Sequence, residues 1–137
     1  MPEPRYLFDT DTISFLMRHP AGSVANRVTT LTSDQYFTSV VVAGELRFGI
    51  AQRGSARLQE RLEVVLSAIE ILPLDPPADE HYASIRMTLS ARGELIGGND
   101  LWIAAHARSL NAHLVTGNLR EFARVPGLDV ENWHTFA

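Results

Sequence analysis

The chain has 137 residues, 45% of them apolar, and a formal net charge of −4. This length and apolar content fit one ordinary folded domain and exclude a disordered chain. The absence of cysteine excludes disulfides and thiolate metal sites, and it fits a reducing cytoplasm. No apolar run approaches the roughly 20 residues that span a membrane, and the opening MPEPRYLF lacks the layout of a signal peptide.

Five short segments have the composition of strands, and helical patterns lie between them. In chain order the expected strands are YLFD, QYFTS, IEILPL, HLVTG and LDVENW. Apolar residues at helical spacing are Val24, Val28 and Leu31, then Leu58, Leu62, Val65, Leu66 and Ile69, then Tyr82, Ile85 and Leu89. The segment DPPADE predicts a helix start, with Asp75 as cap, Pro76 in the first turn, and Asp79 and Glu80 at the positive end of the helix dipole.

Alternation of strands and helices predicts an α/β fold with a parallel sheet covered by helices on both faces. No repeat, linker or low-complexity run divides the chain, so residues 1–137 are expected to form one domain. In such folds the ligand site lies beyond the carboxyl ends of the strands. That edge is therefore where functional side chains are expected.

Three acidic residues are expected at this edge. Asp9 follows the first strand, Glu45 lies about one turn beyond the second, and Asp100 lies in the first turn of the helix after Gly97 and Gly98. Each also has a purely structural interpretation. Asp9 could cap a helix, Glu45 could pair with Arg47 or Arg53, and Asp100 could stabilise a helix dipole.

Four further polar residues support the same edge. Thr116 and Asn118 leave the fourth strand there, Glu121 follows one turn later, and Asp11 lies in the turn after Asp9. Several carboxylates close together repel one another unless a cation lies between them. Oxygen ligands suit Mg²⁺ or Mn²⁺, and the chemistry expected of such a site is phosphodiester hydrolysis by a metal-activated water.

Four segments together resemble the successive motifs of PIN-domain ribonucleases, and most closely those of the VapC toxins of toxin–antitoxin pairs. They are LFDTDTISFL, SVVVAGELRFGI, GGNDLWIAAHARSL and LVTGNLREFARVPGLDVENW. The resemblance implies a three-layer α/β/α sandwich with a five-stranded parallel sheet and RNA cleavage dependent on Mg²⁺ or Mn²⁺. It also implies a homodimer, an RNA substrate, for which transfer RNA is the family-level expectation, and a cognate antitoxin. DNA would be contacted only through that antitoxin. No membrane contact is expected.

By position, Asp9, Glu45 and Asp100 match the acids of the family, and Thr116 matches a site hydroxyl. Asn118 stands where many PIN domains have a fourth acid, which leaves open whether the site binds one metal or two. Asn118 could still be a weak ligand, or Glu121 could take the place of the fourth acid. The acids suit an antitoxin guanidinium inserted among them, with an apolar antitoxin stretch over residues 41–53 and 55–68. All twelve basic residues are arginines, and Arg18, Arg47 and Arg53 are the expected substrate-binding residues near the site.

Two alternatives also use acids after the first strand. In a haloacid-dehalogenase-like phosphatase, Asp9 would be the nucleophile and Asp11 the acid/base, but that family needs a site lysine and a threonine where this chain has Ile13. A non-enzymatic phospho-receiver signalling module would use Asp75 as acceptor and also needs a lysine. The chain has no lysine, and neither alternative explains Glu45.

Overall fold

A five-stranded parallel sheet with strand order β3-β2-β1-β4-β5 forms the centre of the molecule. The computed structural model describes residues 3–135. The strands are β1 (Tyr6–Phe8), β2 (Tyr36–Ser39), β3 (Glu70–Leu72), β4 (His113–Val115) and β5 (Val130–Glu131). All five expected strands are therefore present, and β1 is the central one.

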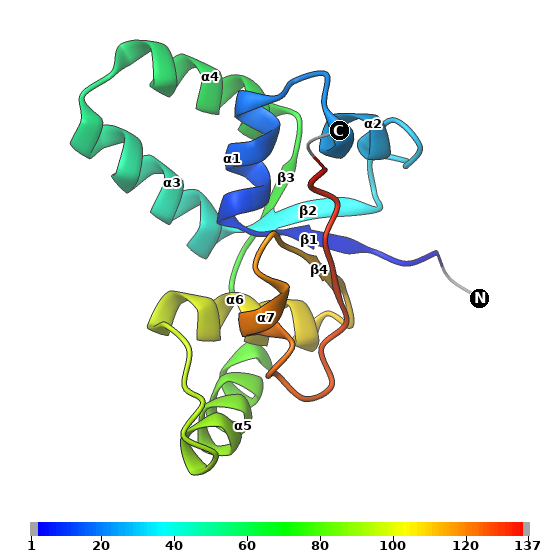
Figure 1. Cartoon of the computed structure of the whole chain (residues 1–137), viewed down its shortest axis with the longest axis vertical. Coiled ribbons are helices and arrows are strands. Elements are labelled where there is room, and N and C mark those ends of the chain that lie inside the picture. The colour runs from blue at the N-terminus through cyan, green and yellow to red at the C-terminus, as the bar shows by residue number, and fades with distance from the viewer. Residues whose placement is uncertain (1–2, 136–137) are drawn as a thin grey trace.

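Helices cover both faces of the sheet (Figure 1). They are α1 (Thr10–Arg18), α2 (Ser23–Val28), α3 (Val40–Arg53), α4 (Ala56–Ser67), α5 (Ala78–Ala91), α6 (Gly98–Ser109) and α7 (Leu119–Phe122). Helices α1 to α4 lie on one side, and α5, α6 and α7 lie on the other (Figure 1). This arrangement confirms the predicted α/β/α sandwich. No helix of the described residues is long and apolar enough to cross a membrane.

The core follows from a parallel sheet that is buried on both faces, because its central strands must then be apolar on both sides. Leu7 and Phe8 of β1 and Leu114 of β4 are completely buried. Helix α6 packs closely on this layer and buries a continuous run of side chains, including Ile103 and Ala104. The first turn of α6, which carries Asp100, is thereby held at the carboxyl edge of the sheet.

The start of α5 differs from the prediction at DPPADE. The helix begins at Ala78, and Asp75 accepts the Ala78 N–H through its backbone carbonyl at 3.0 Å rather than through its side chain. Pro76 and Pro77 have no N–H to donate to an Asp75 cap, which explains why the helix begins after them. The acids Asp79 and Glu80 lie in the first turn, as predicted.

Candidate active site

Asp9 lies between the end of β1 and the start of α1. Its Oδ1 accepts the Thr12 N–H at 3.1 Å, so the residue caps α1, and its side chain is buried. Burial, followed by the adjacent Asp11 carboxyl, raises the pKa of Asp9 to about 9, although the Thr116 hydroxyl and the Thr12 N–H act to lower it. Asp9 therefore holds a proton at neutral pH unless a positive charge approaches it.

Asp100 is the residue at which acids from several elements meet. Its pKa is raised to about 7. Burial is the largest cause, the Glu121 carboxyl is the next, and Glu45 and Asp11 contribute less. These neighbours come from α7, α3 and α1, and Asp100 itself comes from α6. Asp9 joins this group through Asp11, whose carboxyl acts on both Asp9 and Asp100. The structure thus brings together the three acids predicted from the sequence and two of the supporting ones.

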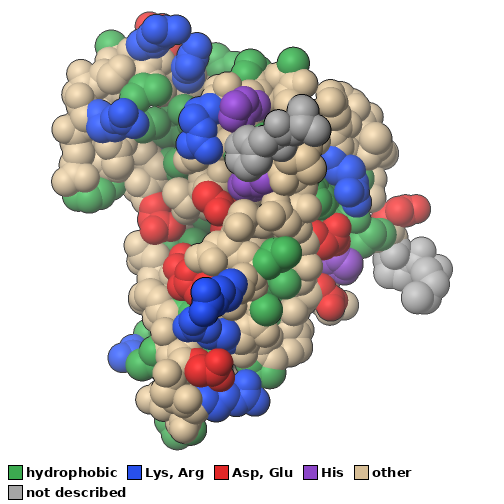
Figure 2. Space-filling model, in the orientation of Figure 1, with side chains coloured by type: hydrophobic (Ala, Val, Ile, Leu, Met, Phe, Trp, Pro, Cys, Tyr) green, Lys and Arg blue, Asp and Glu red, His purple; other side chains and the backbone are tan. Residues whose placement is uncertain are grey.

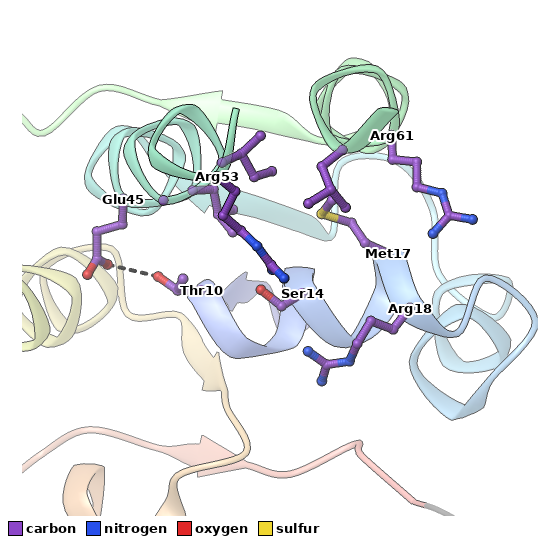
Figure 3. A pocket seen from close by; sticks show the side chains of 11 residues that line it. Thr10, Ser14, Met17, Arg18, Glu45, Arg53 and Arg61 are labelled. Carbon is purple, nitrogen blue, oxygen red and sulfur yellow. Dashed lines mark hydrogen bonds between the residues drawn. The ribbon is translucent and has the colours of Figure 1, made fainter. Parts of the chain in front are cut away.

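Glu45 is held by a threonine rather than by an arginine. The Thr10 hydroxyl donates to its Oε1 at 2.8 Å (Figure 3). In the described part of the chain Glu45 makes no ion pair, so the structural interpretation through Arg47 or Arg53 is wrong. Arg47 instead pairs with Glu63 of α4, on a different side of α3.

The turn after β4 fixes two of the supporting acids. The Gly117 N–H donates to both carboxylate oxygens of Asp11, at 3.1 and 3.2 Å. The Asn118 N–H donates to the Thr116 hydroxyl at 2.9 Å, and the Asn118 side-chain amide donates to the Glu121 carboxylate. A Cβ at Gly117 would lie 2.7 Å from an Asp11 oxygen, so this approach of the two segments requires glycine.

We call Asp9, Asp11, Glu45, Asp100 and Glu121 the acid cluster. Figure 2 shows acidic side chains gathered where the surface is notched between its two parts, with basic side chains on either side. None of the cluster's carboxylates makes an ion pair with an arginine or histidine of residues 3–135. Within the same residues no three acidic or histidine side chains are already grouped as a metal cage.

A groove of about 310 Å³ runs from the acid cluster between α1, α3 and α4 (Figure 3). Thr10 and Glu45 lie at one end, and its apolar lining includes Met17, Leu46, Ile50 and Leu58. Arg18 and Arg53, both predicted from the sequence, line this groove together with Arg61. Arg47 does not, so of the three predicted arginines the structure brings two to the site.

Sequence reasoning missed Thr10, Thr12, Arg61 and His134. Arg61 lies one turn after Arg57 in α4, and nothing in its spacing distinguishes it. Thr12 is completely buried, and its hydroxyl donates to the Val115 carbonyl at 2.8 Å and lies 2.9 Å from His134 Nε2. This last contact joins residues separated by 122 positions, which no local pattern reveals.

Comparisons with known proteins agree with this geometry. The PIN domain family model matches residues 6–128. Ribonuclease VapC2 of Rickettsia felis is 34% identical over 130 residues, covering 93% of this chain and 97% of that protein. The tRNA(fMet)-specific endonuclease VapC of Salmonella typhimurium is 33% identical over 132 residues, covering 94% and 98%. The crystal structure of VapBC2 from R. felis, bound to a DNA fragment from their promoter, superposes with a TM-score of 0.87 at 33% identity and covers 94% of this chain and 98% of that one.

Proposed function

The chain belongs to the VapC ribonucleases of the PIN-domain family, and on that premise we propose that Asp9, Glu45 and Asp100 carry its hydrolysis of RNA phosphodiester bonds. The observation that carries the proposal is the convergence of carboxylates from three helices, α1, α3 and α7, on Asp100 of a fourth, α6, without a basic partner among the described residues. Such a group costs free energy in the folded protein unless it serves a ligand. The phosphatase and phospho-receiver alternatives have no support from the family.

Divalent-cation dependence is general among PIN-domain ribonucleases, and the acid cluster fits such an ion. Its donors are all oxygens, and burial followed by acidic neighbours raises the pKa of both Asp9 and Asp100, so a cation would offset the cost of ionising them. We propose Mg²⁺ or Mn²⁺, with Asp9 and Asp100 as the main protein ligands and Glu45 direct or through water. When bound, the ion supplies positive charge at the phosphate and activates water for attack on phosphorus.

The remaining site residues orient these acids. Thr10 holds Glu45 toward the cluster, and the Thr116 hydroxyl acts to lower the pKa of Asp9. Asn118 holds Glu121 and adds only a weak oxygen donor where many family members have an acid. A single firmly bound ion is therefore the proposed state.

RNA must approach an acidic site, so its phosphates need basic contacts outside the cluster. Arg18, Arg53 and Arg61 line the groove that begins at Glu45, and they are the proposed phosphate-binding residues. The Salmonella relative is named for a transfer RNA, and we propose a transfer RNA as substrate here too. A cytoplasmic location follows from that substrate.

A cognate antitoxin is the proposed partner, since the R. felis structure is a VapBC complex. An apolar antitoxin segment fits the groove lined by Met17, Leu46 and Leu58, and an arginine at its end would pair with the acid cluster. DNA is then contacted through the antitoxin alone. We also propose a homodimer, supported by Val40 and Phe48, which leave 46% and 65% of their surface exposed on α3.

The decisive experiment compares RNA cleavage by the wild-type chain and by Asp9→Asn, each with Mg²⁺, with Mn²⁺ and with a chelator. The substitution keeps the shape of the side chain and removes the charge that would hold the cation. Cleavage should be lost in the variant and in the chelated wild type while the circular dichroism spectrum is unchanged. Unaltered turnover by Asp9→Asn in Mg²⁺ would refute the assignment.

A further inference from the structure

The segment after β5 returns across the sheet toward α2, as the red trace in Figure 1 shows. Trp133 is buried and packs edge-on against Tyr6 and Phe8, with ring centroids 4.9 and 5.5 Å apart. The Thr135 N–H donates to the Ser23 hydroxyl at 2.9 Å. These anchors on either side fix the position of His134 between them.

The ring of His134 lies between α1 and the turn after β4. Its centroid is 4.6 Å from that of Phe15, and its Nε2 is 2.9 Å from the Thr12 hydroxyl. On the other side it packs on Gly117, where an added Cβ would lie 2.9 Å from both Nδ1 and Cε1 of the ring. His134 therefore contacts both segments whose hydrogen bond holds Asp11.

The hydrogen bonds of Thr12 determine which ring nitrogen carries the proton. The Thr12 hydroxyl has one proton, and it donates to the Val115 carbonyl, which can only accept. The contact with His134 must then be Nε2–H donating to the Thr12 oxygen. The Thr12 backbone N–H meanwhile caps Asp9. A chain of contacts thus runs from His134 through Thr12 to the first acid of the site.

We propose that His134 is a positioning residue of the nuclease site, whose Nε2–H group acts through Thr12 to hold the start of α1 against the turn after β4, so that Asp9 and Asp11 face the rest of the acid cluster. The proposal rests on the function proposed above for those acids. His134 orients the acids without touching RNA. The loss of its donor should therefore lower the catalytic rate and metal affinity and leave RNA binding intact.

Three substitutions separate this role from simple packing. His134→Gln can place an amide donor near the position of Nε2, whereas His134→Asn is too short and His134→Ala has no donor. We expect Ala and Asn to lower kcat and Mg²⁺ affinity by about 10- to 100-fold with KM for RNA unchanged, and Gln to restore most of the loss. In a Thr12→Val background, which lacks the acceptor, His134→Ala should add no further loss.

A second readout needs neither metal nor RNA. Nitrogen-15 spectra of the metal-free protein at a pH where His134 is neutral should show the Nε2–H tautomer, and His134→Ala should speed amide exchange at Thr12 and Gly117. Any one of three results would overturn the proposal: the Nδ1–H tautomer, an unchanged kcat in His134→Ala, or an equal loss of kcat in His134→Gln and His134→Asn. If Asp9→Asn itself stayed active, the nuclease assignment would fail, while the tautomer and exchange data would still decide whether His134 holds these segments.

Discussion

The Thr10 hydroxyl donates a 2.8 Å hydrogen bond to Glu45 Oε1 and so joins the first residue of α1 to the middle of α3. Thr10 follows Asp9 directly, and Asp9 is the residue after the central strand β1. This hydrogen bond thus links Glu45 to the residue next to Asp9, at the end of the groove (Figure 3). The relative position of these two carboxylates depends on it.

Removing this hydroxyl should harm catalysis more than folding. Thr10→Val keeps the shape of the side chain but leaves Glu45 without its donor, and we expect cleavage to fall about tenfold. The free energy of unfolding should change by only about 0.5–1.5 kcal/mol, the usual net contribution of one hydrogen bond. Thr10→Ser, which retains the donor, is the control. Equal cleavage by Val and Ser variants would show that the bond does not orient Glu45.

The raised pKa of Asp9 predicts that the metal-free protein loses stability as pH rises. In the unfolded chain this carboxyl ionises near its ordinary value of 3.8, while in the folded protein it keeps its proton to about pH 9. Between these values the native state binds more protons than the unfolded state, so each increase in pH favours unfolding. Ionisation of Asp100 lowers the stability in the same direction as pH rises to about 7.

Thermal melts with a chelator at pH 5, 6, 7 and 8 check this. The wild-type melting temperature should fall across the series, and Asp9→Asn, which cannot ionise, should fall less and melt several degrees above wild type at pH 8. Glu45→Gln is expected to stabilise the metal-free protein as well, by relieving repulsion. A wild-type melting temperature that rose with pH in the chelator would contradict this electrostatic description of the cluster.

The positions of the acids relative to the sheet could be predicted from the sequence, but their hydrogen bonds could not. Asp9 and Asp100 are recognisable because a strand end and a helix start each have local signals, and a parallel sheet brings such ends to one edge. The partners of Glu45 and Arg47 depend on how α3 is rotated against α1 and α4. That rotation results from packing of the whole core, so Thr10 and Glu63 could not be identified beforehand.

Binding of the cation should release protons from Asp100. Because burial and its acidic neighbours raise the pKa of this carboxyl to about 7, it is partly protonated at neutral pH and must ionise to act as a ligand. We expect Mg²⁺ affinity to rise from pH 6 to pH 8, with a heat of binding that depends on the ionisation heat of the buffer. Asp79→Asn, which changes an exposed acid in the first turn of α5, should leave this behaviour intact, whereas Asp100→Asn should lower the affinity and the proton release. Buffer-independent heats would contradict the linkage.

Inhibition by the antitoxin should depend on a single arginine. A guanidinium inserted into the acid cluster gains paired hydrogen bonds and relieves carboxylate repulsion, so replacing it with alanine should cost about 2–4 kcal/mol, or roughly 30- to 1000-fold in Kd. Lysine at the same position should recover only part of this, because it lacks the forked geometry. A co-purified antitoxin that blocked cleavage while leaving the acid cluster open to solvent would contradict this description.

The last prediction concerns how RNA is held. Arg18, Arg53 and Arg61 are exposed and line the groove, whereas Arg47 is engaged with Glu63. Each phosphate contact to single-stranded RNA should contribute roughly 0.7 log units of Kd per log unit of salt.

Replacing Arg53 or Arg61 with glutamine should therefore weaken binding and reduce the salt slope by about that amount. Arg47→Gln should do neither, since it removes only an exposed ion pair of small energy. The measurement is a titration of uncleavable RNA at several salt concentrations, with Asp9→Asn as the background so that no hydrolysis occurs. A flat salt dependence in that background would mean that the groove does not bind the RNA backbone, and would favour a small phosphorylated substrate at the acid cluster instead.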